Sequence, residues 1–327
     1  MLFWVVNAIL KKIIKSVSQQ NMLDNNFSKN KLNTVHYKSS TSMVEVETSS
    51  VDLIITSPPY YNIKDYSKDG FQNKQHSNSS IDDIGNLDTF ENYIEQLLKV
   101  WTECERILKP NGKLCINVPL LPMLKKDLDT HHNRHIFDLQ SKIQQSILDN
   151  TRLFLLDLYI WNRTNPSKKL MFGSYPYPRN FYAQNTTEFI TIYVKDGTPI
   201  NNLPKEVKEA SALTQKEWVE YTKQIWDIPI PNKSDIAFGE HPALMPEEIV
   251  RRCVKLYSFV GDTILDPFTG SGTTLKVVRE LKRNYIGYEL YPNYQTLIDA
   301  KLSQCAIENS LDNSNKMQIM EKLVGVQ

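Results

Sequence analysis

The stretch Thr263–Leu281 reads TILDPFTGSGTTLKVVREL and decides the fold. A short apolar strand leads to Asp266, a turn with Gly270 and Gly272 follows, and the remainder has helical character. Four of the chain's 11 glycines lie between Gly261 and Gly287, which predicts a tight backbone turn. The turn matches neither the spaced G-x-G-x-x-G fingerprint nor a P-loop, which ends in G-K-[ST]. The pattern therefore predicts a strand–turn–helix ligand site of another kind.

An acidic residue stands where the next strand ends. Residues 285–288 read as that strand, and Glu289 follows Asp266 by 23 residues. In nucleotide-binding α/β folds, an acid at about this distance accepts hydrogen bonds from ribose hydroxyls. Both carboxylates are expected at the same edge of the sheet. That edge suits a ligand with hydroxyls and positive charge, and S-adenosylmethionine has both.

A second motif lies far upstream. Residues 51–56 (VDLIIT) form an apolar, β-branched run typical of a buried parallel strand. The run stops at Ser57-Pro58-Pro59-Tyr60, and two prolines cannot continue a central strand. The SPPY segment therefore belongs to a loop at the carboxyl end of that strand, where open α/β sheets bind ligands. Alone, a diproline turn is more often structural; beside the Gly-rich turn it predicts a site.

The remaining pattern alternates between helices and strands. A helix is expected to begin near Asp88 and to end before Pro110. Further helices are expected over 136–149 and 246–256, and strands over 113–118, 153–161 and 189–194. Little chain remains after Glu289, so the other strands must precede the Gly-rich turn. The sequence predicts an α/β fold with the nucleotide half at its C-terminal end.

Composition narrows the class of protein. The chain has 327 residues, with 38 basic and 37 acidic side chains and a net charge of +1, which excludes a polybasic protein. Its four cysteines form no CxxC pair, which argues against a zinc ribbon or a disulfide framework and favours a reducing cytoplasm. The apolar run near Met1 is shorter than the about 20 residues of a membrane span, so no membrane association is expected.

The two motifs together carry a family resemblance. Thr56-Ser-Pro-Pro-Tyr60, followed by Asp266-Pro-Phe-Thr-Gly-Ser-Gly-Thr-Thr274, resembles the β-group exocyclic amino DNA methyltransferases, in which the catalytic motif comes first. The resemblance runs from about Leu32 to about Cys305, and includes Trp161-Asn-Arg163, the strand around Glu188 and His241-Pro-Ala243. It implies a Rossmann-like, S-adenosylmethionine-dependent fold with a mostly parallel, seven-stranded sheet and permuted motif order.

The resemblance also implies roles for named residues. The catalytic residues would be Ser57, Pro58, Pro59 and Tyr60. The cofactor-binding residues would be Asp266, Pro267, Phe268, Gly270, Ser271, Gly272, Thr273, Glu289 and His241, with Phe268 packing on the adenine. One departure stands out: family members usually carry Gly-Asp where this chain has Tyr37-Lys38, and that acid is thought to help hold the adenine.

The chemistry explains the SPPY loop. An exocyclic amine is a poor nucleophile because its lone pair is delocalised into the ring. Ser57 and the Pro58 carbonyl can each accept one amine hydrogen, and proline stiffens the loop that holds them. Tyr60 can stack on the base. Methylation of cytosine C5 would need a cysteine nucleophile after proline, and no Pro-Cys pair occurs.

A DNA-contacting segment is expected between Leu158 and Thr187. This stretch contains no Asp or Glu and interleaves aromatic residues with cations, which suits a phosphate track. The expected DNA-binding residues are Arg163, Lys168, Lys169 and Arg179. No metal is expected, because no cysteine or carboxylate cluster accompanies His131, His132 and His135.

These observations set the expected organisation. It comprises an N-terminal extension (1–30), a catalytic domain (31–310) with a flexible loop (62–87) and a target-recognition insertion (196–240), and a frayed tail (311–327). The expected activity is site-specific methylation of cytosine N4 in a flipped-out base of double-stranded DNA, since the SPPY form is associated with N4 chemistry. Adenine N6 methylation and an inactive DNA-binding descendant stay open. A restriction endonuclease is the expected cognate partner, and the chain is expected to be a monomer or homodimer.

Overall fold

The computed structural model describes residues 31–61, 82–124, 134–165, 175–179, 181, 183–198 and 202–304. The expected N-terminal extension, the tail, most of the 62–87 loop, Lys168 and Lys169 lie outside these residues. No helix in the described part is long and apolar enough to cross a membrane.

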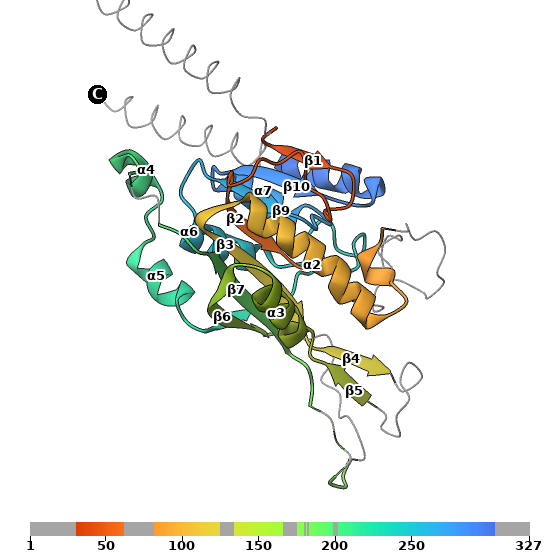
Figure 1. Cartoon of the computed structure of the whole chain (residues 1–327). Coiled ribbons are helices and arrows are strands. Elements are labelled where there is room, and N and C mark those ends of the chain that lie inside the picture. Colours follow the sequence, from red (N-terminus) through yellow and green to blue (C-terminus); the bar gives the residue numbers. More distant parts are fainter. Residues whose placement is uncertain are drawn as a thin grey trace, which may run out of the picture.

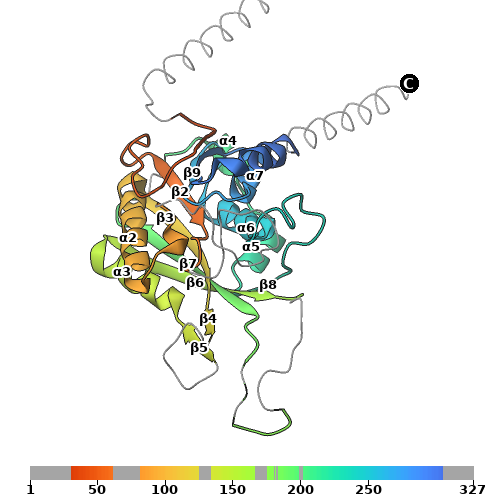
Figure 2. The ribbon, with the colours of Figure 1, turned by 90° about the vertical axis from the view of Figure 1, so that its right-hand side faces the viewer.

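An eight-stranded sheet forms the centre of the molecule, in the order β1-β10-β9-β2-β3-β7-β6-β8 (Figure 1; β8 is labelled in Figure 2). Its strands are β1 (Thr34–His36), β2 (Val51–Thr56), β3 (Leu108–Pro119), β6 (Leu153–Arg163), β7 (Thr187–Lys195), β8 (Ile225–Ile228), β9 (Thr263–Asp266) and β10 (Asn284–Tyr288). In the order of the sheet, the five strands β1, β10, β9, β2 and β3 run parallel to one another. Strands β6 and β8 are also parallel, whereas β7 is antiparallel to both of its neighbours, β3 and β6. The sheet is therefore mostly parallel, as expected.

Helices cover both faces of the sheet (Figure 2). Helices α2 (Phe90–Ile107) and α3 (Leu139–Asn150) lie on one face, and α6 (Glu247–Tyr257), α7 (Thr273–Glu280) and the helical residues 295–304 pack on the other. Shorter elements are η1 (Ile84–Asn86), α4 (Lys205–Ala210), α5 (Gln215–Tyr221), η3 (Pro292–Tyr294) and a hairpin of β4 (Leu121–Leu124) and β5 (Arg134–Phe137). The molecule therefore has three layers, and its fold is of the predicted α/β class.

The central strand β2 explains why the sheet is buried on both faces. Ile54 packs into the core beneath α2, while Leu53 and Ile55 pack into the core beneath α6 and α7. A strand buried on both faces has no polar alternation, which is why VDLIIT reads as a continuous apolar run. In the parallel register, Leu53 lies opposite Ile264 and Ile54 opposite Leu265, so β2 and β9 end together.

The sheet has one strand more than the seven expected. The additional strand, β8, lies inside the segment 196–240 and pairs with the last residues of β6, from Ile160 to Arg163. Trp226 and Ile228 of β8 are buried in the core beneath α6. The run Ile225–Ile228 is short, contains Asp227 and precedes Pro229, so its pattern resembles a loop.

Two helix boundaries also differ from the prediction. Thr89, rather than Asp88, caps α2, because its side chain accepts the Asn92 amide. Helix α3 begins at Leu139, since residues 134–137 pair with β4 instead. Neither difference moves the residues of the predicted site.

Candidate active site

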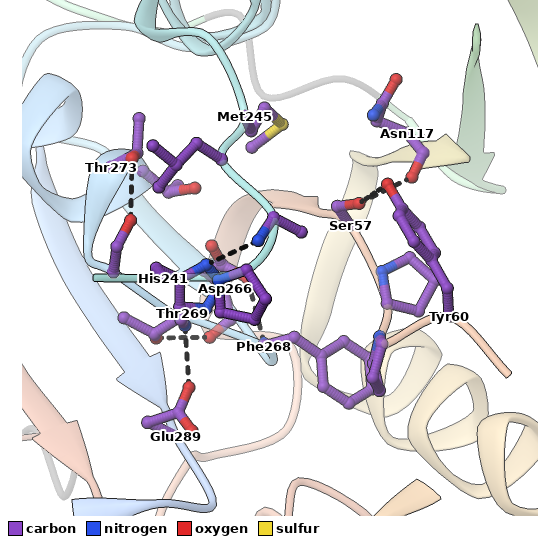
Figure 3. Close-up of a pocket in the computed structure, with 18 of the residues that line it drawn as sticks. Ser57, Tyr60, Asn117, His241, Met245, Asp266, Phe268, Thr269, Thr273 and Glu289 are labelled. Carbon is purple, nitrogen blue, oxygen red and sulfur yellow. Dashed lines mark hydrogen bonds between the residues drawn. The ribbon is translucent and has the colours of Figure 1, made fainter. Parts of the chain in front are cut away.

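A cavity of about 810 Å³ opens at the carboxyl ends of β2, β9 and β10. It brings together two motifs that lie more than 200 residues apart in the sequence. The predicted site residues that line it are Ser57, Pro58, Pro59, Tyr60, Arg163, His241, Asp266, Pro267, Phe268, Gly270, Ser271, Thr273 and Glu289. Figure 3 shows Ser57 and Tyr60 on one side of this cavity and His241, Asp266 and Glu289 on the other, with Phe268 between them.

The SPPY loop is held from two sides. The Ser57 hydroxyl donates to the backbone carbonyl of Asn117 in β3 at 3.0 Å and lies 3.0 Å from the Tyr60 hydroxyl. The Tyr93 hydroxyl, from α2, donates to the Pro59 carbonyl at 3.0 Å. These contacts anchor the loop to the neighbouring strand and to the covering helix.

The contacts fix the polarity of the Ser57 hydroxyl. A serine hydroxyl has one proton and two lone pairs. The carbonyl of Asn117 can only accept, so Ser57 gives it the proton, and Tyr60 must then donate to Ser57. The Ser57 oxygen can therefore accept one further hydrogen. This is the role that a hydroxyl needs beside an amine N–H.

A direct hydrogen bond joins the two motifs. The Thr56 hydroxyl donates to Asp266 Oδ1 at 2.8 Å, and the Phe268 amide donates to the same oxygen at 3.0 Å. Asp266 is 2 % exposed, and burial raises the pKa of its carboxyl to about 6. The end of the catalytic strand is thus tied to the start of the Gly-rich turn.

Glu289 organises the far end of the cavity. Its Oε2 accepts the Gly270 amide at 2.8 Å and its Oε1 accepts the Tyr291 amide at 2.9 Å. Burial raises the pKa of Glu289 to about 7, and the charge of Asp266 pushes it in the same direction. A ligand that donates hydrogen bonds to Glu289 would therefore favour the ionised carboxylate and release the carboxyl proton to solvent.

His241 packs directly on the Gly-rich turn. Its ring lies against Tyr294, with centroids 4.9 Å apart, and a Cβ on Gly270 would lie 2.8 Å from His241 Nε2. Gly270 has a φ of +53°, so both its backbone conformation and the closeness of His241 require glycine.

Gly272 differs from the other predicted cofactor residues. It does not line the cavity; it adopts a φ of +85°, and a Cβ there would lie 3.3 Å from Ile298. We assign it a structural role, because it lets the helical residues 295–304 approach the turn. The spacing of the glycines in the sequence does not distinguish a glycine that lines the cavity from one that packs against a helix.

The departure at Lys38 has a structural counterpart. Lys38 lines the cavity, and its Nζ lies 2.6 Å from Glu45 Oε1. The other oxygen of Glu45 accepts the Tyr288 hydroxyl at 3.1 Å. Glu45 therefore supplies an acid beside the position where the family usually carries one. Glu45 lies seven residues further along the chain, and no signal in the sequence predicted that it would pair with Lys38.

The predicted DNA-binding residues fall into two groups. Arg163 lies at the cavity edge, donates to the Thr186 and Asn185 carbonyls, and has its Nη1 3.5 Å from Glu188 Oε1. Glu188 in turn accepts the Asn117 side-chain amide at 2.8 Å. Arg179 does not line the cavity; it lies in an exposed segment beside Tyr177.

Of the three histidines singled out in the sequence, one lies in the described part of the chain. There, no group of three or more His, Cys, Asp or Glu side chains could hold an ion. His135 is exposed on β5, whereas His131 and His132 lie outside the described residues.

The sheet order, the Gly-rich turn and the facing SPPY loop define a Rossmann-like methyltransferase. The chain belongs to the DNA methylase family of N6/N4 methyltransferases, whose model matches residues 51–300. It is therefore a DNA methyltransferase.

Individual relatives agree with this membership. The chain is 32 % identical to the type II methyltransferase M.MjaI of Methanocaldococcus jannaschii, over 80 % of this chain and 88 % of the relative. Among solved structures, TTHA0409 of Thermus thermophilus, a putative DNA modification methylase complexed with S-adenosyl-L-methionine, is 26 % identical. It superposes with a TM-score of 0.62 over 83 % of this chain and 93 % of that one. The cytosine-N4-specific PvuII DNA methyltransferase shares the fold, with a TM-score of 0.56 and 16 % identity over 83 % of this chain and 86 % of that one.

Proposed function

We propose that this DNA methyltransferase transfers a methyl group from S-adenosylmethionine to cytosine N4 at a specific site in double-stranded DNA. We further propose that it is the modification enzyme of a restriction system, with a cognate endonuclease. The observation that carries the proposal is the Ser57 hydroxyl, set as an acceptor in the same cavity as Asp266 and Glu289. The names of the type II relatives support the second part.

The chemistry of the cavity fits S-adenosylmethionine. The cofactor carries ribose hydroxyls, an ammonium and a sulfonium, and the buried carboxylates of Glu289 and Asp266 accept hydrogen bonds and balance positive charge. Phe268 offers an aromatic face for adenine, and its ring already lies edge-on to Trp101 at 6.3 Å. Pro267, Gly270, Ser271, Thr273 and His241 would complete the site. When bound, S-adenosylmethionine supplies an electrophilic methyl group on sulfur.

The residues of the SPPY loop would prepare the amine. Ser57 Oγ accepts one amine hydrogen and the Pro58 carbonyl accepts the other, which draws the nitrogen away from planarity. Tyr60 and Pro59 shape the face on which the base stacks. The link from Thr56 to Asp266 holds this loop at a fixed distance from the Gly-rich turn. Preorganised acceptors cost no rearrangement during the reaction.

The target base must leave the duplex to reach this cavity, at a cost of a few kcal/mol. Arg163, Lys168, Lys169 and Arg179 are the proposed DNA contacts, with Arg163 at the cavity edge. The segments 62–87 and 196–240 stay our proposals for closing over the base and for recognising the sequence.

The direct test identifies the product. Purified protein is incubated with labelled S-adenosylmethionine and duplex DNA of mixed sequence, and the DNA is digested to nucleosides for mass spectrometry. We expect N4-methylcytosine. N6-methyladenine would overturn the proposal that cytosine is the target base, but S-adenosylmethionine would remain the methyl donor and the fold would be unaffected. If no methylated nucleoside forms, a titration with the cofactor separates a missing recognition sequence from an inactive DNA-binding descendant.

A further inference from the structure

A buried lysine lies behind the cofactor wall of the cavity. Lys301, in the helical residues 295–304, is 1 % exposed. Its Nζ lies 2.7 Å from Thr273 Oγ1 and 3.0 Å from Asp235 Oδ1. Lysine is almost never fully buried unless its charge is paired, so a specific role for this ammonium is expected.

Lys301 joins three segments that are distant in the sequence. Thr273 is the first residue of α7 and lines the cavity. Asp235 lies in the loop that leads to His241, and the Ala237 carbonyl of that loop accepts the His241 amide at 3.0 Å. Ile298, one turn before Lys301, packs 3.3 Å from the position of a Cβ on Gly272. The ammonium therefore sits where these segments meet the Gly-rich turn.

The chemistry of the ammonium fixes the direction of the hydrogen bonds. An ammonium has three donors and no acceptor, so the Thr273 oxygen must accept from Lys301. Thr273 must then give its own proton elsewhere: into the cavity, or to the Ser271 hydroxyl, which lies 3.3 Å away. If Thr273 donates to Ser271, the Ser271 hydroxyl must point its own proton away from Thr273. Because both residues line the cavity, this wall can offer a hydroxyl donor to a ligand.

The opposite polarity is found at Glu289 and Asp266, which present acceptors. We propose that Lys301 is a positioning residue that makes the Ser271–Thr273 wall bind the carboxylate of the cofactor's amino-acid end. This inference rests on the proposed function, in which S-adenosylmethionine is the cofactor. Removal of the ammonium would free the Thr273 hydroxyl to turn and would leave the Asp235 carboxylate unneutralised behind the wall.

The test compares two ligands that differ only in that carboxylate. S-adenosylhomocysteine and its decarboxylated analogue, 5′-(3-aminopropylthio)-5′-deoxyadenosine, are titrated into each variant by calorimetry. In Lys301→Met we expect the affinity for S-adenosylhomocysteine to fall about tenfold or more, because hydrogen bonds to charged groups are the strong ones. The affinity for the analogue should change by less than about threefold. The double variant Lys301→Met, Asp235→Asn should show the same selective loss. It removes the charge of Asp235 together with the ammonium, so the loss cannot come from an unpaired Asp235 carboxylate.

Lys276→Met is the matched control. Lys276 lies on the same helix as Thr273 and is also buried, but its Nζ pairs with Glu247 at 2.9 Å and Glu280 at 2.7 Å. We expect it to lose stability without changing the ratio of the two affinities. Should Lys301→Met fail to fold, Thr273→Val, which removes the hydroxyl alone, must show the selective loss.

Equal loss of both ligands, or no loss of either, would overturn the role of Lys301. If the unaltered protein binds both ligands and the variants keep the same ratio of the two affinities, only this inference fails. If the unaltered protein binds neither ligand, the proposed cofactor is itself wrong and the role of Lys301 falls with it.

Discussion

At the residue scale, the site depends on carboxylates that are buried before any ligand arrives. Glu289 is 8 % exposed and receives two backbone amides, and burial raises its pKa to about 7. Because its folded pKa lies above its unfolded value, the group is protonated in the free protein at pH 6 and ionised at pH 8. Its contribution to folding stability accordingly decreases as the pH rises from about 4.5 to about 7.

This titration predicts a pH-dependent affinity. Donors such as ribose hydroxyls and an ammonium favour the ionised form of Glu289, so ligand binding must expel the proton below about pH 7. We expect the dissociation constant of S-adenosylhomocysteine, measured by calorimetry, to rise about tenfold from pH 8 to pH 6. Glu289→Gln should bind weakly at both values and keep at most about a twofold change, because the pKa of Asp266 is about 6. A tenfold change that persists in Glu289→Gln would assign the titration to another group.

At the element scale, two glycines on either side of strand β9 meet different demands: Gly261 precedes the strand, and Gly270 lies in the Gly-rich turn that follows it. Gly270 lies against the His241 ring, whereas Gly261, with a φ of +89°, has no atom within 4 Å of its potential Cβ. Both positions have a left-handed backbone, but only one is crowded by a residue of the cavity. The pair therefore separates backbone strain from damage to the site.

Substitution of these glycines gives a matched experiment. Gly270→Ala and Gly261→Ala should each cost about 1 kcal/mol of unfolding free energy, because alanine is strained at positive φ. Gly270→Ala should in addition displace His241 and weaken S-adenosylhomocysteine binding about tenfold or more. Chemical denaturation and calorimetry measure the two effects. Equal ligand affinities in the two variants would contradict the placement of His241 at the site.

At the scale of the whole molecule, the sheet extends into a segment whose sequence reads as an insertion. Trp226 of β8 is fully buried, stacks on Tyr159 with centroids 4.5 Å apart, and donates its indole N–H to the Tyr221 carbonyl. The Arg252 guanidinium of α6 lies 5.2 Å from its ring. Strand β8 is therefore part of the core beneath α6.

Substitutions of two tryptophans test whether β8 is part of the core. Trp226→Ala should destabilise the protein by about 3–5 kcal/mol, because it opens a large cavity in the core. Trp218→Ala, in α5, should change stability by less than about 0.5 kcal/mol, since that side chain is 59 % exposed. Urea denaturation followed by circular dichroism measures both. A small effect of Trp226→Ala would mean that β8 is dispensable to the fold.

The sequence predicts those parts of the site that local chemistry marks. The SPPY loop, the Gly-rich turn and Glu289 each follow a strand, and parallel strands end at one edge, so their convergence could be predicted. Asn117 could not, because it contributes a backbone carbonyl. The positions of Glu45 and Lys301 beside the site depend on tertiary contacts, and Trp226 lies in a run too short to read as a strand.

The central claim is that the SPPY loop performs the chemistry while the Gly-rich turn holds the cofactor. The most direct measurement is made on Ser57→Ala, in which turnover on duplex DNA and the affinity for S-adenosylhomocysteine are determined together. We predict that turnover falls by at least about a hundredfold, because one preorganised acceptor is lost. The affinity should stay within about threefold, since Ser57 lies across the cavity from Glu289. Retained turnover, or a loss that follows cofactor affinity alone, would contradict the account.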